Sequence, residues 1–174
     1  MHGIGGQRRL QYGDIVKLDV GVMMEGWIGD SAVTVPVGLV APPVQRLLDV
    51  TEEALRLAID QARPGNRVGD ICHAVESFVT RKGYSVVREF VGHGVGRRLH
   101  EEPQIPNYGS PGSGPELRPG MVLAIEPMVN EGRPEITYRE DKWTVATADG
   151  SLSAHFEHRS EERRVGKECR FRWS

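Results

Sequence analysis

The chain has 174 residues, of which 39% are hydrophobic and 26% are charged, an ordinary composition for a globular domain. No apolar run approaches the roughly 20 residues needed to span a bilayer, and the start, MHGIGGQRRL, lacks the basic-then-apolar order of a signal peptide. The first 158 residues hold 16 basic and 21 acidic side chains, which disfavours nucleic-acid binding. Two cysteines without a CxxC pair suit a reducing compartment. We therefore expect a cytoplasmic protein that binds neither nucleic acid nor membrane.

The first half of the chain predicts a hairpin followed by two helices. Two β-rich runs, residues 14–23 and 27–35, are joined by a short turn that ends in glycine. Apolar residues then recur at helical spacing over residues 44–62 and again over residues 68–82. Proline and glycine close the first of these helices, and glycine closes the second.

Strand patterns dominate the second half. A stretch rich in Gly and Pro, residues 92–116, is long enough to suggest a functional loop. The order of hairpin, helices and strands predicts an α+β fold with a mostly antiparallel sheet. The strand-like runs are residues 84–91, 121–129, 135–139, 143–147 and 152–157.

A repeated phrase gives the best indication of function. LQYGDIVKLD ends on Asp19, and LRPGMVLAIE ends on Glu126, 107 residues later. In both copies an apolar run leads to a carboxylate where strand patterning would favour Val or Ile. The two acids therefore require a functional explanation.

Two aspartates of the hairpin come close together in either of two registers. A turn centred on residues 24–25 places Asp19 directly opposite Asp30, whereas a turn centred on residues 25–26 makes them diagonal neighbours. Both registers leave the carboxylates on one face, because strand side chains alternate with a period of two. Facing carboxylates repel each other, so either a divalent cation lies between them or both are solvated on an exposed face.

Two histidines follow in the Gly-rich stretch. His93 stands in GHGVG, where the glycines allow close approach of the backbone, and His100 stands in LHEEP. The glycine spacing is no dinucleotide fingerprint, because Arg97 occupies its last position. One histidine alone is more often a surface or structural residue. Two histidines beside acid-bearing strands indicate parts of one centre.

The order of these motifs resembles the type I methionine aminopeptidases over most of residues 1–158. The matching segments are KLDVGV, GDSAVTVPVG, VGHGVGRRLHEEPQIPNYG, LRPGMVLAIEPMV and KWTVATADGSLSAHFEH. The resemblance implies the pita-bread fold, a pseudo-two-fold antiparallel sheet flanked by helices, which accounts for the repeated phrase. It also implies five metal ligands, at Asp19, Asp30, His93, Glu126 and Glu157.

Four carboxylates and one imidazole form an oxygen-rich ligand set that suits Mn, Fe, Co or Mg, and less clearly Zn. The resemblance implies two divalent ions, from among Co, Mn, Fe, Zn and Ni. Asp30 and Glu157 would bridge them, Asp19 would complete one ion, and His93 with Glu126 would complete the other. Such ions lower the pKa of a bound water from 15.7 to about 7, which supplies a nucleophile at neutral pH.

By the same resemblance, the reaction removes the N-terminal methionine from nascent polypeptides by hydrolysing the first peptide bond. Glu126 would take a proton, while His100 would hydrogen-bond the scissile carbonyl. His2 would contact the scissile amide and so also bind substrate. Trp143 and Leu99 would line the apolar pocket, Leu99 in place of the family's usual aromatic residue. The partners would be N-terminal Met peptides and nascent chains at the ribosome, and the enzyme would be a monomer.

Both ends of the chain depart from the family pattern. The family continues upstream of His2, so we expect residues 1–158 to be an N-terminally truncated, partial metallopeptidase catalytic domain. Residues 159–174 read RSEERRVGKECRFRWS, with nine charged residues in sixteen and no strand period. These residues resemble the translation of a sequencing-adapter read-through, which implies an artefactual tail, and the alternative is a short, disordered basic tail. Glu157 would then lack a following strand to secure it.

Two alternative functions stay open on the same fold. One is a metal-free peptide-binding relative, which the complete ligand set argues against. The other is a proline-specific peptidase, which the motifs HGVGRRLHEEP and LSAHFEH disfavour. Metal content separates the first alternative from an aminopeptidase, and a comparison of Met-Gly with X-Pro peptides separates the second.

Overall fold

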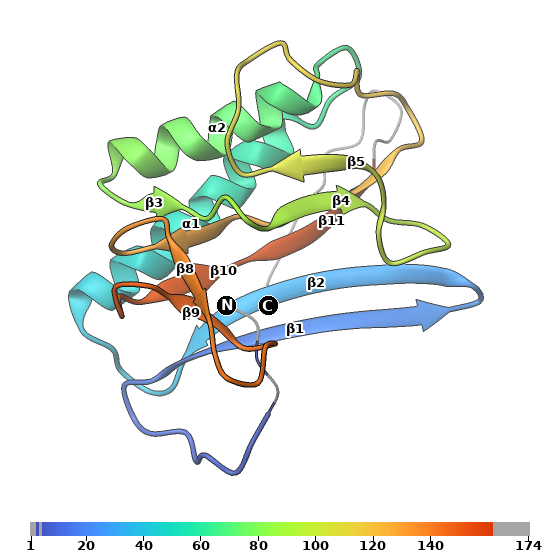
Figure 1. The fold of residues 1–174 in the computed structure, drawn as a ribbon. Coiled ribbons are helices and arrows are strands. Elements are labelled where there is room, and N and C mark those ends of the chain that lie inside the picture. The colour runs from blue at the N-terminus through green and yellow to red at the C-terminus, as the bar shows by residue number, and fades with distance from the viewer. Residues whose placement is uncertain (1–2, 4, 162–174) are drawn as a thin grey trace.

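The computed structural model describes residue 3 and residues 5–161, which fold into two helices and eleven strands (Figure 1). The helices are α1 (Pro42–Gln61) and α2 (Val68–Arg81). The strands are β1 (Ile15–Met24), β2 (Trp27–Pro36), β3 (Ser85–Val86), β4 (Val91–Gly94), β5 (Glu101–Pro106), β6 (Val122–Ile125), β7 (Met128–Asn130), β8 (Ile136–Tyr138), β9 (Val145–Thr147), β10 (Ser153–His155) and β11 (Glu157–Glu161).

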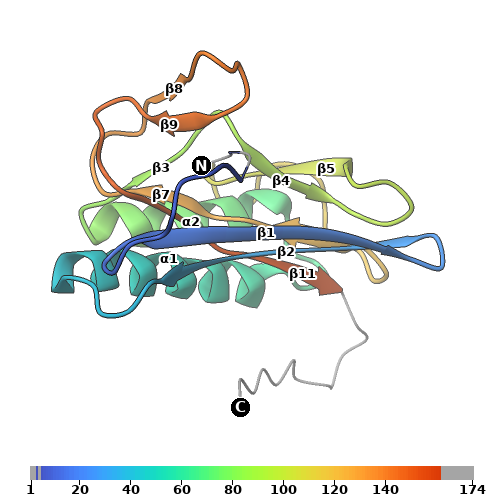
Figure 2. The ribbon, with the colours of Figure 1, turned by 90° about the horizontal axis from the view of Figure 1, so that it is seen from below.

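The strands form one large sheet and two small ones. The large sheet has six strands in the order β1-β2-β11-β6-β4-β5, and every neighbouring pair is antiparallel. The small sheets are β10-β7-β3 and the pair β8-β9. Figure 2 shows both helices on one side of the strands and the β8–β9 pair on the other. The predicted α+β class with antiparallel pairing is confirmed.

The helices cover one side of the sheets because each carries a continuous apolar stripe. Helix α1 buries Leu47, Ala54 and Ala58, and α2 buries Ile71 and Val75, at the spacing that brings side chains onto one helix face. These residues share a core with β6, β7 and β10. The opposite side of the large sheet is therefore free to carry polar side chains.

The β1–β2 hairpin adopts the second of the two expected registers. Glu25 and Gly26 form the turn, both with positive φ, and Met24 pairs with Trp27. Two positive φ values match the right-handed twist of the strands, which favours this kind of turn in hairpins. Asp30 consequently lies opposite Gly21 and is a diagonal neighbour of Asp19.

Three runs predicted as single strands are each divided in two, because the chain passes from one sheet to another within them. Glu126 and Pro127 separate β6 in the large sheet from β7 in the small one, and Phe156 separates β10 from β11. The Phe156 N–H donates to the Pro127 carbonyl at 3.3 Å, so these two breaks are adjacent. Glu126 and Glu157 thus stand at neighbouring breaks. The three runs predicted as single strands and found divided are residues 84–91 (β3 and β4), 121–129 (β6 and β7) and 152–157 (β10 and β11).

Strand β5 was expected to be part of a loop. It pairs with β4, with an irregularity of the register between His93 and Gly94. A Cβ atom on Gly94 would lie 2.2 Å from the Glu102 carbonyl oxygen, and one on Gly92 would lie 2.4 Å from that of Ala124. The glycines on either side of His93 therefore let β5 and β6 approach β4 closely.

Strand β11 continues beyond the point where a strand pattern ends in the sequence. It pairs with β2 at Glu157 and His158 and with β6 from His158 to Glu161. Pairing with β2 and β6 stabilises β11, although its charged sequence does not predict a strand. Glu157 therefore does have a following strand that holds it in the sheet. The expected domain boundary at His158 falls inside β11, and the tail from residue 162 onward lies outside the described residues. Among residues 3 and 5–161, no helix is long and apolar enough to cross a membrane.

Candidate metal centre

The five predicted ligands lie on, or directly after, five neighbouring strands of the large sheet. Asp19 lies on β1, Asp30 on β2, Glu157 at the start of β11, Glu126 directly after β6 and His93 on β4. Asp19 and Glu157 both pair with Ala32, from opposite sides of β2. A small residue between them leaves room for a cation. Residues separated by up to 138 positions thus meet through strand order and register.

The shortest approaches join an imidazole to carboxylates. His93 Nε2 lies 3.5 Å from Glu126 Oε1 and 3.7 Å from Asp30 Oδ2. Ligand atoms of Asp30, His93 and Glu157 all lie within 4.8 Å of one another. Oxygen and nitrogen donors converging at this spacing suit a divalent cation bound by several of them.

The ring of His93 is oriented by its own strand. Its Nδ1 lies 2.9 Å from the carbonyl oxygen of Gly94, and because a carbonyl only accepts, Nδ1 donates. Nε2 then keeps its lone pair and directs it toward the carboxylates. A hydrogen bond from the other ring nitrogen is the usual way in which proteins orient a metal-ligating histidine.

The carboxylates are buried where their negative charges are unfavourable. Burial raises the pKa of Glu157 to about 9, and the charges of Glu126, Asp30 and Asp19 add to the effect. Burial also raises the pKa of Glu126 to about 8, followed by the charges of Asp30 and Asp19. The pKa of Asp30 is raised by burial and then by Asp19, with partial compensation from nearby histidines. A divalent cation would relieve this repulsion, so the donor set fits a metal.

Asp19 lies at the rim of this group. It is exposed on β1, and the three residues whose ligand atoms converge are Asp30, His93 and Glu157. Its charge nevertheless contributes to the raised pKa values of Asp30, Glu126 and Glu157. Asp19 is therefore electrostatically part of the centre, on its solvent side.

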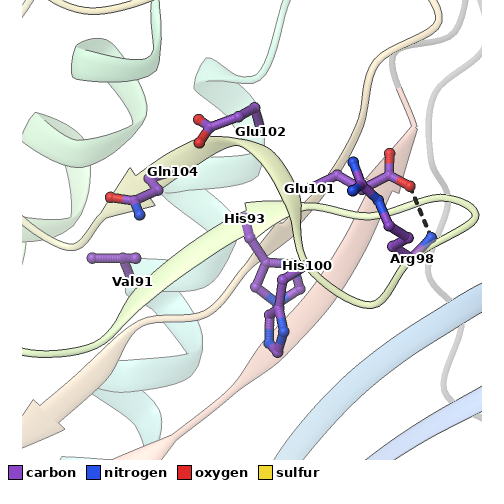
Figure 3. Close-up of a pocket in the computed structure, with 7 residues that line it drawn as sticks. All are labelled: Val91, His93, Arg98, His100, Glu101, Glu102 and Gln104. Atoms are coloured by element: carbon purple, nitrogen blue, oxygen red, sulfur yellow. Dashed lines mark hydrogen bonds between the residues drawn. The ribbon is translucent and has the colours of Figure 1, made fainter.

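The predicted substrate residues of the β4–β5 connection also lie beside the centre. The ring of His100 meets the ring of His93 edge to face, with centroids 4.4 Å apart (Figure 3). Both line a cavity of about 400 Å³. Leu99 lies over the hairpin, since a Cβ on Gly21 would be 3.6 Å from Leu99 Cδ1. The other residues around the cavity are Val91, Arg98, Glu101, Glu102 and Gln104.

Trp143 is not joined to this group by a contact among the described residues. Trp143 is 60% exposed in the β8–β9 connection, where its backbone N–H donates to Asp141 Oδ1 at 3.0 Å. His2 lies outside the described residues. Its neighbour Gly3 lies near Thr144, because a Cβ there would be 3.8 Å from Thr144 Cγ2.

The sequence interpretation missed His155, which lies behind Glu126. His155 Nε2 is 3.6 Å from Glu126 Oε2, and the residue is 3% exposed. Burial lowers the pKa of His155 to about 4, so the ring is neutral at physiological pH. The two-residue spacing from Glu157 was a weak signal for His155, because the run reads as one strand in the sequence and the break at Phe156 is set by the tertiary structure. Asn107 was also missed; its Nδ2 donates to the Glu126 carbonyl at 3.1 Å.

Comparison with known proteins agrees with this geometry. The model of metallopeptidase family M24 matches residues 1–160. Methionine aminopeptidase 1 of Bacillus subtilis is 53% identical over 158 residues, which are 91% of this chain and 64% of that protein. Methionine aminopeptidase of Clostridium perfringens is 48% identical over 158 residues, which are also 91% of this chain and 64% of that protein. The chain therefore spans slightly less than two thirds of the length of these relatives.

Solved structures show the same architecture. Methionine aminopeptidase of Thermotoga maritima superposes with a TM-score of 0.86 at 51% identity, covering 88% of this chain and 61% of that one. The enzyme of Rickettsia prowazekii gives 0.91 at 44% identity, covering 93% and 66%. Prolidase from Pyrococcus furiosus gives 0.75 at 23% identity, covering 95% and 43%, and shares the fold. The expected pita-bread fold is thus confirmed, and the chain belongs to metallopeptidase family M24.

Proposed function

We propose that this chain removes the N-terminal methionine from polypeptides by metal-dependent hydrolysis of the first peptide bond. The observation that carries the proposal is the convergence of ligand atoms of Asp30, His93 and Glu157, with Glu126 Oε1 3.5 Å from His93 Nε2. The relatives of about 50% identity, which are named methionine aminopeptidases, support this substrate class.

We assign Asp19, Asp30, His93, Glu126 and Glu157 as ligands of two divalent cations, from among Co, Mn, Fe, Zn and Ni. Four carboxylates offset the charge of two such ions, which supports that number. When bound, divalent cations polarise a carbonyl and make water acidic enough to act as a nucleophile near neutral pH. The chain's own contribution is to hold the carboxylates of Glu126 and Glu157 in buried positions beside His93.

Glu126 is the proposed proton acceptor. Its carboxylate is buried beside His93 Nε2, where burial favours its protonated form. His100 is exposed at the cavity beside His93, so its ring is accessible to the scissile carbonyl of a substrate. A hydrogen bond there stabilises the negative charge that develops on the carbonyl oxygen.

Substrate contacts are proposed for the remaining predicted residues. Leu99 offers an apolar surface over the hairpin to the methionine side chain, and Trp143 offers an exposed indole from the β8–β9 connection. His2 would contact the scissile amide. We propose that the substrates are N-terminal Met peptides and nascent chains, met at the ribosome in the cytoplasm, and that the chain acts as a monomer.

The test compares peptide cleavage by the purified chain loaded with Mn²⁺ or Co²⁺. Release of methionine from a Met-Gly peptide, without cleavage of an X-Pro peptide, is the expected result. Glu126→Gln removes the proposed proton acceptor and should abolish release. The matched control is Glu131→Gln, which neutralises an exposed carboxylate five residues away and should leave the rate unchanged.

Three results would contradict the proposal. Cleavage of X-Pro peptides in preference to Met-Gly peptides would indicate a proline-specific peptidase. Peptide binding by a protein that takes up no metal would indicate a metal-free relative. Unchanged methionine release by the Glu126→Gln variant would rule out the assigned role of Glu126.

A further inference from the structure

We propose that His155 positions the carboxylate of Glu126 by donating a hydrogen bond from Nε2 to Oε2. The role rests on the proposed function, because it prepares Glu126 as a metal ligand and proton acceptor. His155 itself touches neither substrate nor metal in this assignment. It is a positioning residue.

The carboxylate of Glu126 lies between two imidazoles. Oε1 is 3.5 Å from His93 Nε2 on one side, and Oε2 is 3.6 Å from His155 Nε2 on the other. The two histidines come from different sheets, β4 in the large one and β10 in the small one. Each carboxylate oxygen of Glu126 therefore lies near the Nε2 atom of a different histidine.

The Nε2 atom of His155 is buried and has no hydrogen-bond partner among the described residues. A buried polar atom in this condition is rare and costly, so an acceptor that already faces it is its natural partner. That acceptor is Glu126 Oε2, a few tenths of an ångström beyond hydrogen-bond distance. When Glu126 is ionised, as a metal ligand must be, its oxygens only accept, so Nε2 of His155 has to carry the proton for this contact to be a hydrogen bond.

The backbone of His155 is held, which leaves the carboxylate as the group that adjusts. Thr34 Oγ1 donates to the His155 carbonyl at 2.7 Å and accepts from the His155 N–H at 2.9 Å. The backbone of Glu126 is held in turn by Asn107. With both backbones fixed, a small rotation of the Glu126 carboxylate closes the contact, since the terminal torsion of glutamate is soft.

Fixing Oε2 determines where Oε1 points. When His155 holds Oε2, Oε1 faces His93 Nε2 and the converging ligands Asp30 and Glu157. Partners of this kind, which orient a ligand without touching the metal, change metal affinity or activity by roughly 10- to 100-fold when removed. A side chain that merely filled space at this position would have no such effect.

The test measures Mn²⁺ affinity by calorimetry without substrate, together with kcat and KM for methionine release, on the full chain. His155→Phe keeps a ring and removes the donor, whereas His155→Gln keeps a donor of similar reach. We expect the Phe variant to lose roughly 10- to 100-fold in Mn²⁺ affinity and in kcat, with KM little changed. The Gln variant should keep most of both.

A control separates positioning from loss of stability. Val129→Ala removes buried volume from β7, the strand beside β10, and should lower the melting temperature without weakening Mn²⁺ binding. If His155→Phe does not fold, His155→Asn takes its place, because its amide is polar but too short to reach Glu126. The Asn variant should then show the loss of affinity.

Two results would overturn the inference. One is wild-type Mn²⁺ affinity in the donor-free variant, and the other is an equal loss in the Gln and Phe variants, which would indicate packing alone. If the wild-type chain binds Mn²⁺ but releases no methionine, the proposed function fails. The ranking of Mn²⁺ affinities among these variants still decides the role of His155.

Discussion

Glu157 should destabilise the metal-free protein at neutral pH, and replacing it with glutamine should reverse that effect. Its ordinary pKa of 4.5 is raised to about 9 in the folded state, mainly by burial and then by the charges of Glu126, Asp30 and Asp19. A raised carboxyl pKa leaves stability intact below pH 4.5 and removes it progressively as the pH rises to about 9.

The magnitude follows from the difference between the unfolded pKa and the working pH. At pH 7 the unfolded chain ionises Glu157 and the metal-free folded chain keeps it protonated. At about 1.4 kcal/mol per pH unit, this favours unfolding by about 3 kcal/mol relative to acidic pH. Glu157→Gln keeps the shape and cannot ionise. It should therefore raise the free energy of unfolding by about 3 kcal/mol at pH 7, and by nothing at pH 4.

The assay is urea unfolding of chelator-treated protein at pH 4, 7 and 9, compared between wild type and Glu157→Gln. The difference in unfolding free energy between the two proteins is free of contributions from other titrating groups, because both proteins share them. One such group is the buried His155, which destabilises the fold at acidic pH. Glu131→Gln, an exposed control, should show no pH-dependent difference. Equal stability of Glu157→Gln and wild type at pH 7 and 9 would refute the reasoning that the acids repel in the absence of metal.

Three further predictions concern the metal and the packing around it. Adding Mn²⁺ at about 100 times its dissociation constant should stabilise wild type by about 2.7 kcal/mol but Glu157→Gln by much less, as measured by thermal melting; equal stabilisation would exclude Glu157 as a ligand. Gly94→Ala should cost about 1 to 3 kcal/mol and weaken Mn²⁺ binding, because its Cβ would meet the Glu102 carbonyl at 2.2 Å, whereas Gly6→Ala, with nothing within 4 Å, should change neither. Leu47→Ala should cost about 2 to 5 kcal/mol in urea unfolding while Mn²⁺ affinity is retained, since this fully buried residue belongs to the core of the helices; loss of Mn²⁺ binding by the folded variant would contradict that separation.

Local patterns predicted the two helices and the two hairpin strands. Both helices and both hairpin strands begin and end within two residues of the predicted limits. Their periodicity is a property of the segment alone, so no knowledge of partners was needed. The ligand types were also readable, because an acid at the end of an apolar run and a histidine between glycines contradict ordinary patterning.

The predictions failed where the partner of a segment sets its structure. The breaks at Pro127 and Phe156 arise because each chain segment leaves one sheet for another, and the sheet that it joins is not encoded in its own period. Strand β11 exists because β2 and β6 pair with it on both sides, although its residues are highly charged.

The amino-acid sequence thus specified which residues carry the chemistry, since chemical type and local period are visible along a single chain. Strand order and register specified how they meet: Asp19 and Glu157 face one another across Ala32, and His93 reaches Glu126. His155 illustrates the difference most clearly. Its position in the sequence is that of any strand residue, but burial and the proximity of Glu126 give it a role, because long-range packing sets both.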